Sequence, residues 1–153
     1  MGIDKIPFSY YQGKLQCEHL IESSGIPYTI LRTTQFHDFA DYVASKLLKL
    51  PISIAPKTLK VQPIQVEAVA LELNKIIEHS PLNNTYSIGG KKIYNLNEII
   101  DSLLKVHQKS RQMYYMPPIG KIIKGFVAGY NTCDNISIAS NTWEEYLSNK
   151  YCQ

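Results

Sequence analysis

A tyrosine and a lysine four residues apart are the side chains of this sequence that could do acid–base chemistry together. The chain contains three such pairs. They are Tyr10 with Lys14, Tyr42 with Lys46, and Tyr146 with Lys150. Because 153 residues with 11 Tyr and 14 Lys would contain about one such pair by chance, the spacing alone does not identify a site. The surrounding sequence must distinguish the three pairs.

A phenol beside an ammonium group is suited to proton transfer. Free tyrosine titrates near pH ~10 and exchanges protons poorly at neutral pH, but a neighbouring positive charge favours the phenolate form. Residues four apart on a helix project side by side. Such a tyrosine could give a proton to a carbonyl oxygen as hydride reaches the carbon, and the lysine would add charge for the developing oxyanion. The alternative is that the two side chains merely coat a helix.

The elements predicted around Tyr10 and Lys14 would place this pair near a ligand site. A capping-box pattern that begins at Ser9 predicts a helix from about Tyr10, and a Gly-Ile-Pro sequence ends it. The β-branched run at 28–33 is typical of a buried strand. The polar and aromatic cluster RTTQFHDF follows it. Ligands of open α/β sheets bind beyond the carboxyl ends of strands, so this cluster is a candidate site. The other two pairs have no such setting, and we interpret them as surface-helix residues.

Strands alternate with helices along the rest of the chain. Apolar spacing predicts that Leu15, Leu20 and Ile21 lie on one buried helix face. It also predicts a buried stripe on a later helix, formed by Val66, Val69, Leu73, Ile76 and Ile77. The expected elements after the first strand are a helix at 36–50, strands at 52–55 and 59–65, a helix at 66–79, a strand at 84–90, a helix at 95–107, a strand at 111–116, a helix at 119–129 and a short final helix. This alternation favours an α/β layer architecture.

Composition indicates one ordinary globular domain and argues against several functions. The chain is 44% hydrophobic and 19% charged, with a net charge of +3, and it lacks the clustered, arginine-rich surface of a nucleic-acid-binding protein. The 3 cysteines and 4 histidines show no metal-ligand spacing, so we expect no metal and reduced thiols in a cytoplasmic protein. No apolar run approaches membrane-spanning length, so no membrane partner is expected.

The segment YYQGKLQCEHLIESSGIPYTILRTTQFHDF resembles the central part of the atypical short-chain dehydrogenase/reductases, specifically the NmrA-like NAD(P)-binding proteins. In that family a Tyr-x-x-x-Lys helix precedes a similar strand and loop. The segments VQPIQVEAVALEL and NTYSIGGKKIYNLNEIIDSLL resemble the family's later strand and helix and its substrate-side segment, and NTWEEYL resembles a common ending. The resemblance implies a partial Rossmann-like, doubly wound parallel sheet with a substrate-side lobe.

The resemblance also implies roles for individual residues. Tyr10 would be the catalytic acid or base, and Lys14 would also bind the ribose of the nicotinamide. The residues that would flank the nicotinamide and the substrate are Thr33, Thr34, Gln35 and Phe36. Core packing is the alternative for Phe36. His37 is interpreted as a helix-cap or surface histidine, and Trp143 as a packing anchor.

The sequence departs from the family at the phosphate cradle. The family binds pyrophosphate on a glycine-rich turn at a helix N-terminus, but the eight glycines of this chain form no G-x-G-x-x-G. Residues 1–153 are therefore expected to be the C-terminal portion of an NAD(P)-binding domain, with the glycine-rich half outside the chain. The cofactor would need residues beyond these, and we expect self-association or a partner chain to complete the sheet.

The implied function is NAD(P)-dependent oxidation or reduction of a small carbonyl or alcohol substrate. Two alternatives remain open at this point. One is an NmrA-like sensor that binds the dinucleotide without turning it over. The other is a truncated product with no activity of its own. The strand that selects between NADH and NADPH in such folds is the second one, and it is absent from this chain.

Overall fold

The computed structural model describes residues 1–152 and has helices and strands in alternation. The helices are α1 (Ser9–Ser23), α2 (His37–Lys49), α3 (Val66–Ile77), α4 (Leu96–Val106), α5 (Lys121–Val127) and α6 (Trp143–Tyr151). The strands are β1 (Thr29–Thr33), β2 (Ile54–Ala55), β3 (Lys60–Val61), β4 (Asn84–Ile88), β5 (Tyr94–Asn95) and β6 (Tyr114–Tyr115). The order agrees with the α/β architecture expected from the sequence.

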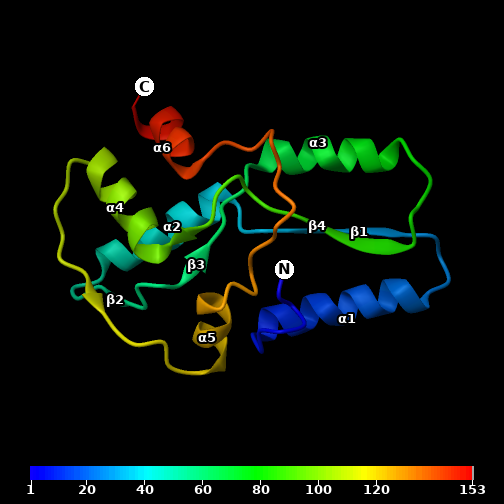
Figure 1. Ribbon diagram of the computed structural model, residues 1–153, viewed down its shortest axis with the longest axis horizontal. Coiled ribbons are helices and arrows are strands. Elements are labelled where there is room, and N and C mark those ends of the chain that lie inside the picture. The colour runs from blue at the N-terminus through cyan, green and yellow to red at the C-terminus, as the bar shows by residue number, and fades with distance from the viewer. Residues whose placement is uncertain (153) are drawn as a thin grey trace.

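The parallel pair of β1 and β4 is the sheet from which the site is built. Its register runs from Thr29 opposite Asn84 to Thr33 opposite Ile88. In Figure 1, α3 lies on one side of this pair and α1 on the other. Helices on both sides of a parallel sheet are the layers of a doubly wound fold. The carboxyl ends of both strands therefore lie at the same edge, where the loop after Thr33 begins.

The second lobe is a helical core made by α2, α4 and α6, which lie together away from the β1–β4 pair in Figure 1. Ile100, Leu103, Trp143 and Leu147 are fully buried in it. The indole Nε1 of Trp143 donates to the carbonyl oxygen of Ile99 at 3.2 Å. Trp143 is therefore the packing anchor that the sequence predicted.

The helix ends show which of the capping and stop signals predicted from the sequence are used in the structure. The predicted cap at Ser9 is wrong: α1 begins at Ser9, and Phe8 occupies the N-cap position without a side-chain cap. The helix stops where predicted, because Gly25 adopts φ +72°, which a glycine accepts at little cost. The capping box at Asn95 is confirmed, and its backbone N–H donates to the Glu98 carboxylate at 2.7 Å.

The helix faces predicted to be buried are covered only in part: Val69 of α3 is buried, but residues toward the C-terminal end of each helix are exposed. Leu20 of α1 is 72% exposed and Ile77 of α3 is 78% exposed. In α1 the one buried side chain is that of Glu18, and it binds Arg32 of β1 with Nε···Oε1 at 3.0 Å. A sheet of two strands is too narrow to cover two amphipathic helices. For the same reason β1, predicted as a buried strand, is only half buried along its whole length.

The remaining predicted strands are shorter than expected and do not join this sheet. Of the strand predicted at 52–55, only β2 forms, and it pairs in parallel with β6. Of the strand predicted at 59–65, only β3 forms, and it pairs antiparallel with β5. Pro63, which lacks a backbone N–H, limits the second run. The described residues thus form three two-stranded sheets rather than one.

A buried glutamine connects the segments beyond the strand ends. The Gln62 side chain is fully buried. Its Nε2 donates to the carbonyl oxygens of Gly90 at 2.8 Å and Cys133 at 3.0 Å. Its Oε1 accepts from the backbone N–H of Cys133 at 2.8 Å. All the polar atoms of this amide are used, as burial of a polar group requires.

We expect Gly90→Ala to destabilise the fold strongly and Gly13→Ala to stabilise it. A Cβ on Gly90 would overlap the carbonyl oxygen of Pro63, whereas a Cβ on Gly13 would meet no atom within 4 Å. Alanine at Gly13 should add about 0.5–1 kcal/mol, because glycine is a poor helix former. Urea unfolding of both variants measures the difference. Equal stability of the two would contradict the packing described at Gly90.

We expect the isolated chain to self-associate. Among the described residues only β4 pairs with β1, so one edge of a parallel strand is open. Leu20, on the helix that precedes β1, adds an exposed apolar side chain. Sedimentation velocity should show a concentration-dependent shift to larger species. Leu20→Lys should weaken it, and Ile138→Lys, at a loop residue that is 85% exposed, should not. A strictly monomeric chain with a sharp melt would contradict the prediction.

Candidate functional site

The loop that follows β1 contains the residues expected to flank the cofactor and the substrate. Thr33 ends β1 opposite Ile88 of β4, so the loop lies at the carboxyl edge of the sheet. Thr34 is buried, and its hydroxyl accepts from the backbone N–H of Gly90 at 3.3 Å. The carbonyl oxygen of Gln35 accepts from the N–H of Ile64 at 2.9 Å. The position of this loop at the end of the strand was therefore predicted correctly from the sequence. The Thr34 hydroxyl, however, already accepts a hydrogen bond from the protein itself.

Phe36 occupies the N-cap position of α2, where its backbone is extended. It also forms a parallel bridge with Ile64. Phe36 is 37% exposed, so core packing does not account for the whole residue. An aromatic surface therefore remains open at the start of the helix.

Tyr10 and Lys14 lie side by side on α1 and face solvent. Tyr10 is 60% exposed, and the Nζ of Lys14 is 5.6 Å from the centre of its ring. Tyr42 is 59% exposed, with the Nζ of Lys46 at 5.4 Å. The helical spacing alone therefore produces the same local geometry at two places. What separates them is position, because α1 leads into β1 and its loop.

Tyr11, which the sequence analysis did not nominate, makes the contact between α1 and this loop. Burial raises the pKa of its phenol, while a hydrogen bond with the side chain of Gln35 partly offsets this. Its ring lies 6.2 Å from that of Phe126 on α5. The available signal was that Tyr11 and Leu15 are four residues apart and share the inner face of α1.

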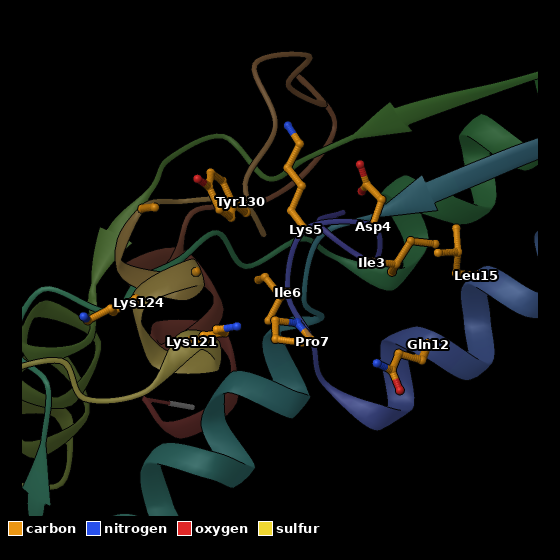
Figure 2. A pocket seen from close by; sticks show the side chains of 12 residues that line it. Ile3, Asp4, Lys5, Ile6, Pro7, Gln12, Leu15, Lys121, Lys124 and Tyr130 are labelled. Atoms are coloured by element: carbon orange, nitrogen blue, oxygen red, sulfur yellow. The ribbon is translucent and has the colours of Figure 1, made fainter.

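A wide hollow of about 640 Å³ lies beside the start of α1. Figure 2 shows the loop at 3–7 with side chains of α1 and α5 around it, including Gln12 and Lys121. The charged side chains that line it are those of Lys5, Lys121, Lys124 and Asp4. Three ammonium groups against one carboxylate make its rim positive, which favours an approaching anion.

Tyr146 and Lys150, interpreted from the sequence as surface residues, instead belong to a hydrogen-bonded cluster between α6 and α2. The Nζ of Lys150 is 2.6 Å from the phenol oxygen of Tyr146 and 2.8 Å from Oδ2 of Asp41. The Tyr146 hydroxyl donates to Asp38 at 2.7 Å. The interpretation failed because residues 105 or more positions away supply the partners, which no local pattern reveals.

This cluster stabilises charges and is not suited to an acid–base role. Burial lowers the pKa of Lys150, but hydrogen bonds with Asp41 and Tyr146 outweigh it and raise the pKa overall. Burial and the bond to Asp38 raise the pKa of Tyr146 well above its ordinary value. The phenol therefore stays protonated and the lysine stays charged. Their hydrogen bonds to Asp38 and Asp41 hold α6 against α2.

His37 is buried, so its interpretation as a surface or capping histidine is wrong. It is 2% exposed, and its ring stacks 4.9 Å from that of Tyr146 and 6.2 Å from that of Trp143. Neither ring nitrogen has a hydrogen-bond partner within the described chain. Burial lowers its pKa from 6.5 to about 4. The imidazole is therefore a neutral part of an aromatic stack.

The described residues offer neither a metal-binding cluster nor a membrane-spanning helix. Residues 1–152 contain no group of three histidine, cysteine or carboxylate side chains that could hold a metal ion. Over the same residues, every helix is too short or too polar to cross a bilayer. Cys17 and Cys152 are exposed, Cys133 is partly buried, and all three are free thiols.

The fold is similar to those of several solved oxidoreductases and sugar-nucleotide epimerases. The chain superposes on an NADPH-dependent quinone oxidoreductase from Escherichia coli with a TM-score of 0.74 and 17% identity, over 99% of this chain and 65% of that one. It superposes on a nucleoside-diphosphate-sugar epimerase from Staphylococcus aureus with a TM-score of 0.66 and 18% identity, over 94% of this chain and 59% of that one. It superposes on a UDP-glucuronic acid 4-epimerase from Bacillus cereus, solved with NAD, with a TM-score of 0.55 and 19% identity, over 95% of this chain and 54% of that one.

These likenesses confirm the Rossmann-like α/β fold. The chain spans between 54% and 65% of the lengths of these three proteins. No protein-family model matches the sequence, and no curated protein sequence matches it. At such identities the likeness concerns the backbone arrangement, and the chemistry must be argued from the residues.

We expect His37 to make stability depend on pH between about 4 and 6.5. In that range the unfolded histidine binds a proton that the folded one does not, so stability falls as the pH falls. Between pH ~7 and pH ~5 the loss should be about 2 kcal/mol. Urea unfolding at the two pH values measures it. His37→Phe should remove this loss, and the matched change at the exposed His19 should leave it in place. A loss that persists in His37→Phe would contradict the assignment.

Proposed function

We propose that this chain is the catalytic and substrate-side part of an NAD(P)-dependent oxidoreductase of the atypical short-chain dehydrogenase/reductase type, NmrA-like. It would transfer hydride to or from the carbonyl or alcohol carbon of a small molecule. The observation that carries the proposal is the superposition of 99% of the chain on an NADPH-dependent quinone oxidoreductase. The three free thiols suit a reducing compartment, which we take to be the cytoplasm.

The residues present fit the nicotinamide end of a dinucleotide but not its pyrophosphate. Lys14 would hold the ribose, and the loop from Thr33 to Phe36 would border the ring. The adjacent glycines Gly89 and Gly90 offer no phosphate cradle, because both are buried and a Cβ on Gly89 would lie 2.5 Å from the Gln62 amide. The pyrophosphate site therefore needs residues outside this chain, as the domain boundary expected from the sequence implies.

Tyr10 and Lys14 supply the proton chemistry in this proposal. A nicotinamide dinucleotide supplies or accepts the hydride. The Tyr10 hydroxyl gives its proton to the substrate oxygen during reduction and takes one back during oxidation. The Lys14 ammonium, 5.6 Å from the ring, stabilises negative charge on the phenol and on the substrate oxygen. The exposure of both side chains leaves their side of α1 open to a cofactor and to the missing part of the domain.

A dinucleotide-binding sensor without turnover is the second candidate. It is favoured by the contact between α1 and the strand-end loop, which Tyr11 makes through Gln35. If Tyr10 never approaches the substrate, the fold would still bind a dinucleotide once completed. Turnover and cofactor affinity of Tyr10→Phe separate the two functions.

The isolated chain should bind NADH and NADPH weakly or not at all, because the residues that would contact the pyrophosphate are absent. Nicotinamide fluorescence during titration with each dinucleotide measures this. Micromolar binding by the chain alone would mean that another surface, such as the lysine-lined hollow, holds the phosphates. A Lys121→Ala, Lys124→Ala double variant would then identify it.

With the domain completed, in one chain or by a partner, Tyr10→Phe should lower turnover by about 10²–10⁴-fold and leave cofactor affinity nearly unchanged. Lys14→Met should weaken both turnover and affinity. Tyr42→Phe is the matched control, since its lysine lies at nearly the same distance, and it should have no effect. Wild-type turnover in Tyr10→Phe, with the cofactor still bound, would favour the sensor.

A further inference from the structure

The helix that bears Tyr10 and Lys14 is held to the sheet mainly by polar side chains. Three side chains of α1 face inward, at the i, i+4 and i+7 spacing of one helix stripe. They are Tyr11 and Leu15, which are half buried, and Glu18, which is buried, while every other side chain of the helix is exposed. Apolar contact is non-directional, and here it comes mainly from one leucine. It therefore cannot set the rotation of α1 about its own axis.

The guanidinium of Arg32, on β1, binds the Glu18 carboxylate through two nitrogens. Nε lies 3.0 Å from Oε1 and 3.1 Å from Oε2, and Nη2 also donates to Oε2. The Glu18 side chain is 12% exposed and the Arg32 side chain 23%. Asp4, in the loop before α1, lies 3.9 Å from Nη1 of the same guanidinium. Because a bidentate pair has a fixed geometry, Arg32 connects β1, α1 and the preceding loop in one orientation.

A second polar contact lies two helix turns away from the first. The Tyr11 hydroxyl is hydrogen bonded to the side chain of Gln35, in the loop after β1. The seven residues of helix from Tyr11 to Glu18 rise about 10.5 Å, and the three residues of extended chain from Arg32 to Gln35 span about 10 Å. The two contacts therefore match in spacing, and α1 is fixed along the strand as well as around its axis.

The direction of Glu18 determines where the candidate acid–base pair points. Successive residues of a helix are turned by about 100°. Lys14 and Tyr10, four and eight residues before Glu18, therefore project about 40° and about 80° from it on the same flank. Helical side chains reach about 5–6 Å from the axis, so a rotation of about 10° moves their ends by about 1 Å. A misplacement of that size can cost about 100-fold in rate.

We propose that Arg32 is a positioning residue, which fixes the rotation of α1 through the Glu18 carboxylate and so holds Tyr10 and Lys14 in the direction that proton transfer needs. Arg32 itself takes no part in that transfer. A buried ion pair suits this task because it adds directional specificity even where it adds little net stability. The fixing of α1 does not depend on the proposed oxidoreductase function, whereas its effect on turnover rests on that function.

The distance between two spin labels on the full chain tests whether Arg32 fixes α1. One label is attached to Cys17 of α1 and the other to Asn74→Cys, an exposed position of α3 on the other side of the β1–β4 pair (Figure 1). Cys133→Ser and Cys152→Ser remove the other two thiols. The labelled chain is diluted with unlabelled chain, so that self-association adds no further distances. The unchanged ion pair should give one narrow distribution of distances.

The apolar variant carries Glu18→Leu together with Arg32→Met. Replacing both members of a buried ion pair by apolar side chains of similar volume is often neutral or stabilising. The urea midpoint of this variant should therefore be unchanged or higher, while its distance distribution should be wider. A role in stability alone would leave the distribution narrow.

Two single variants complete the experiment on the isolated chain. Arg32→Lys keeps the charge and loses the fork, so it should also widen the distribution, and it serves if the apolar variant does not fold. The matched control is Arg111→Lys, at the other arginine of the chain, which donates to the backbone carbonyl oxygens of Leu50 and Pro51. It should leave the distribution unchanged. Narrow distributions in both Arg32 variants would overturn the proposal.

Turnover in the completed domain separates this inference from the proposed function. The apolar variant should be about 10–100-fold slower, and adding it to Tyr10→Phe should lower turnover no further, because Arg32 acts through Tyr10. Effects that multiply would overturn the inference, as would wild-type turnover of the apolar variant beside a slow Tyr10→Phe. Wild-type turnover of Tyr10→Phe would instead contradict the proposed function, and the spin-label distances would still decide whether Arg32 fixes α1.

Discussion

The buried amide of Gln62 is the interaction on which the arrangement of the two lobes depends. It joins the segment after β3 to the glycine turn after β4 and to the chain near Cys133, with three hydrogen bonds of 2.8–3.0 Å. An amide in this position must find all its partners at once, because an unpaired buried donor or acceptor costs about 1–3 kcal/mol. The glycines at 89 and 90 are part of the same requirement, since side chains there would occupy the space of Gln62 and Pro63.

This connection determines where the candidate site lies. The loop from Thr33 to Phe36 is attached to the same region, through Thr34 to Gly90 and through Gln35 to Ile64. The loop at the sheet edge, the glycine turn and the helical lobe are thus held in one position relative to each other. A site on rigid supports is more precisely placed than one on a free loop. The side chains of α1, in contrast, stand on a helix whose outer face remains open.

The three tyrosine–lysine pairs show how the same spacing leads to different chemistry. Tyr10 and Tyr42 each have a lysine 5.4–5.6 Å from the ring and are about equally exposed. Tyr146 has the same spacing, but two aspartates of another helix hold it and its lysine as structural partners. The spacing creates the pair, and the neighbours from distant segments decide whether it is free to act. Only Tyr10 with Lys14 is both free and on the helix that leads to the strand-end loop.

The sequence by itself determined the order of the helices and of the strands other than β5, the end of α1 at Gly25, the cap at Asn95 and the position of the loop after β1. These features depend on residues within a few positions of one another, where propensity and backbone sterics act. The tertiary structure alone decided which faces are covered. It left Leu20 and Ile77 exposed, buried His37 against the rings of Tyr146 and Trp143, and brought Tyr11 rather than its neighbour against Gln35. Burial depends on how much surface the rest of the fold supplies, and two strands supply too little to cover the helices on either side of them.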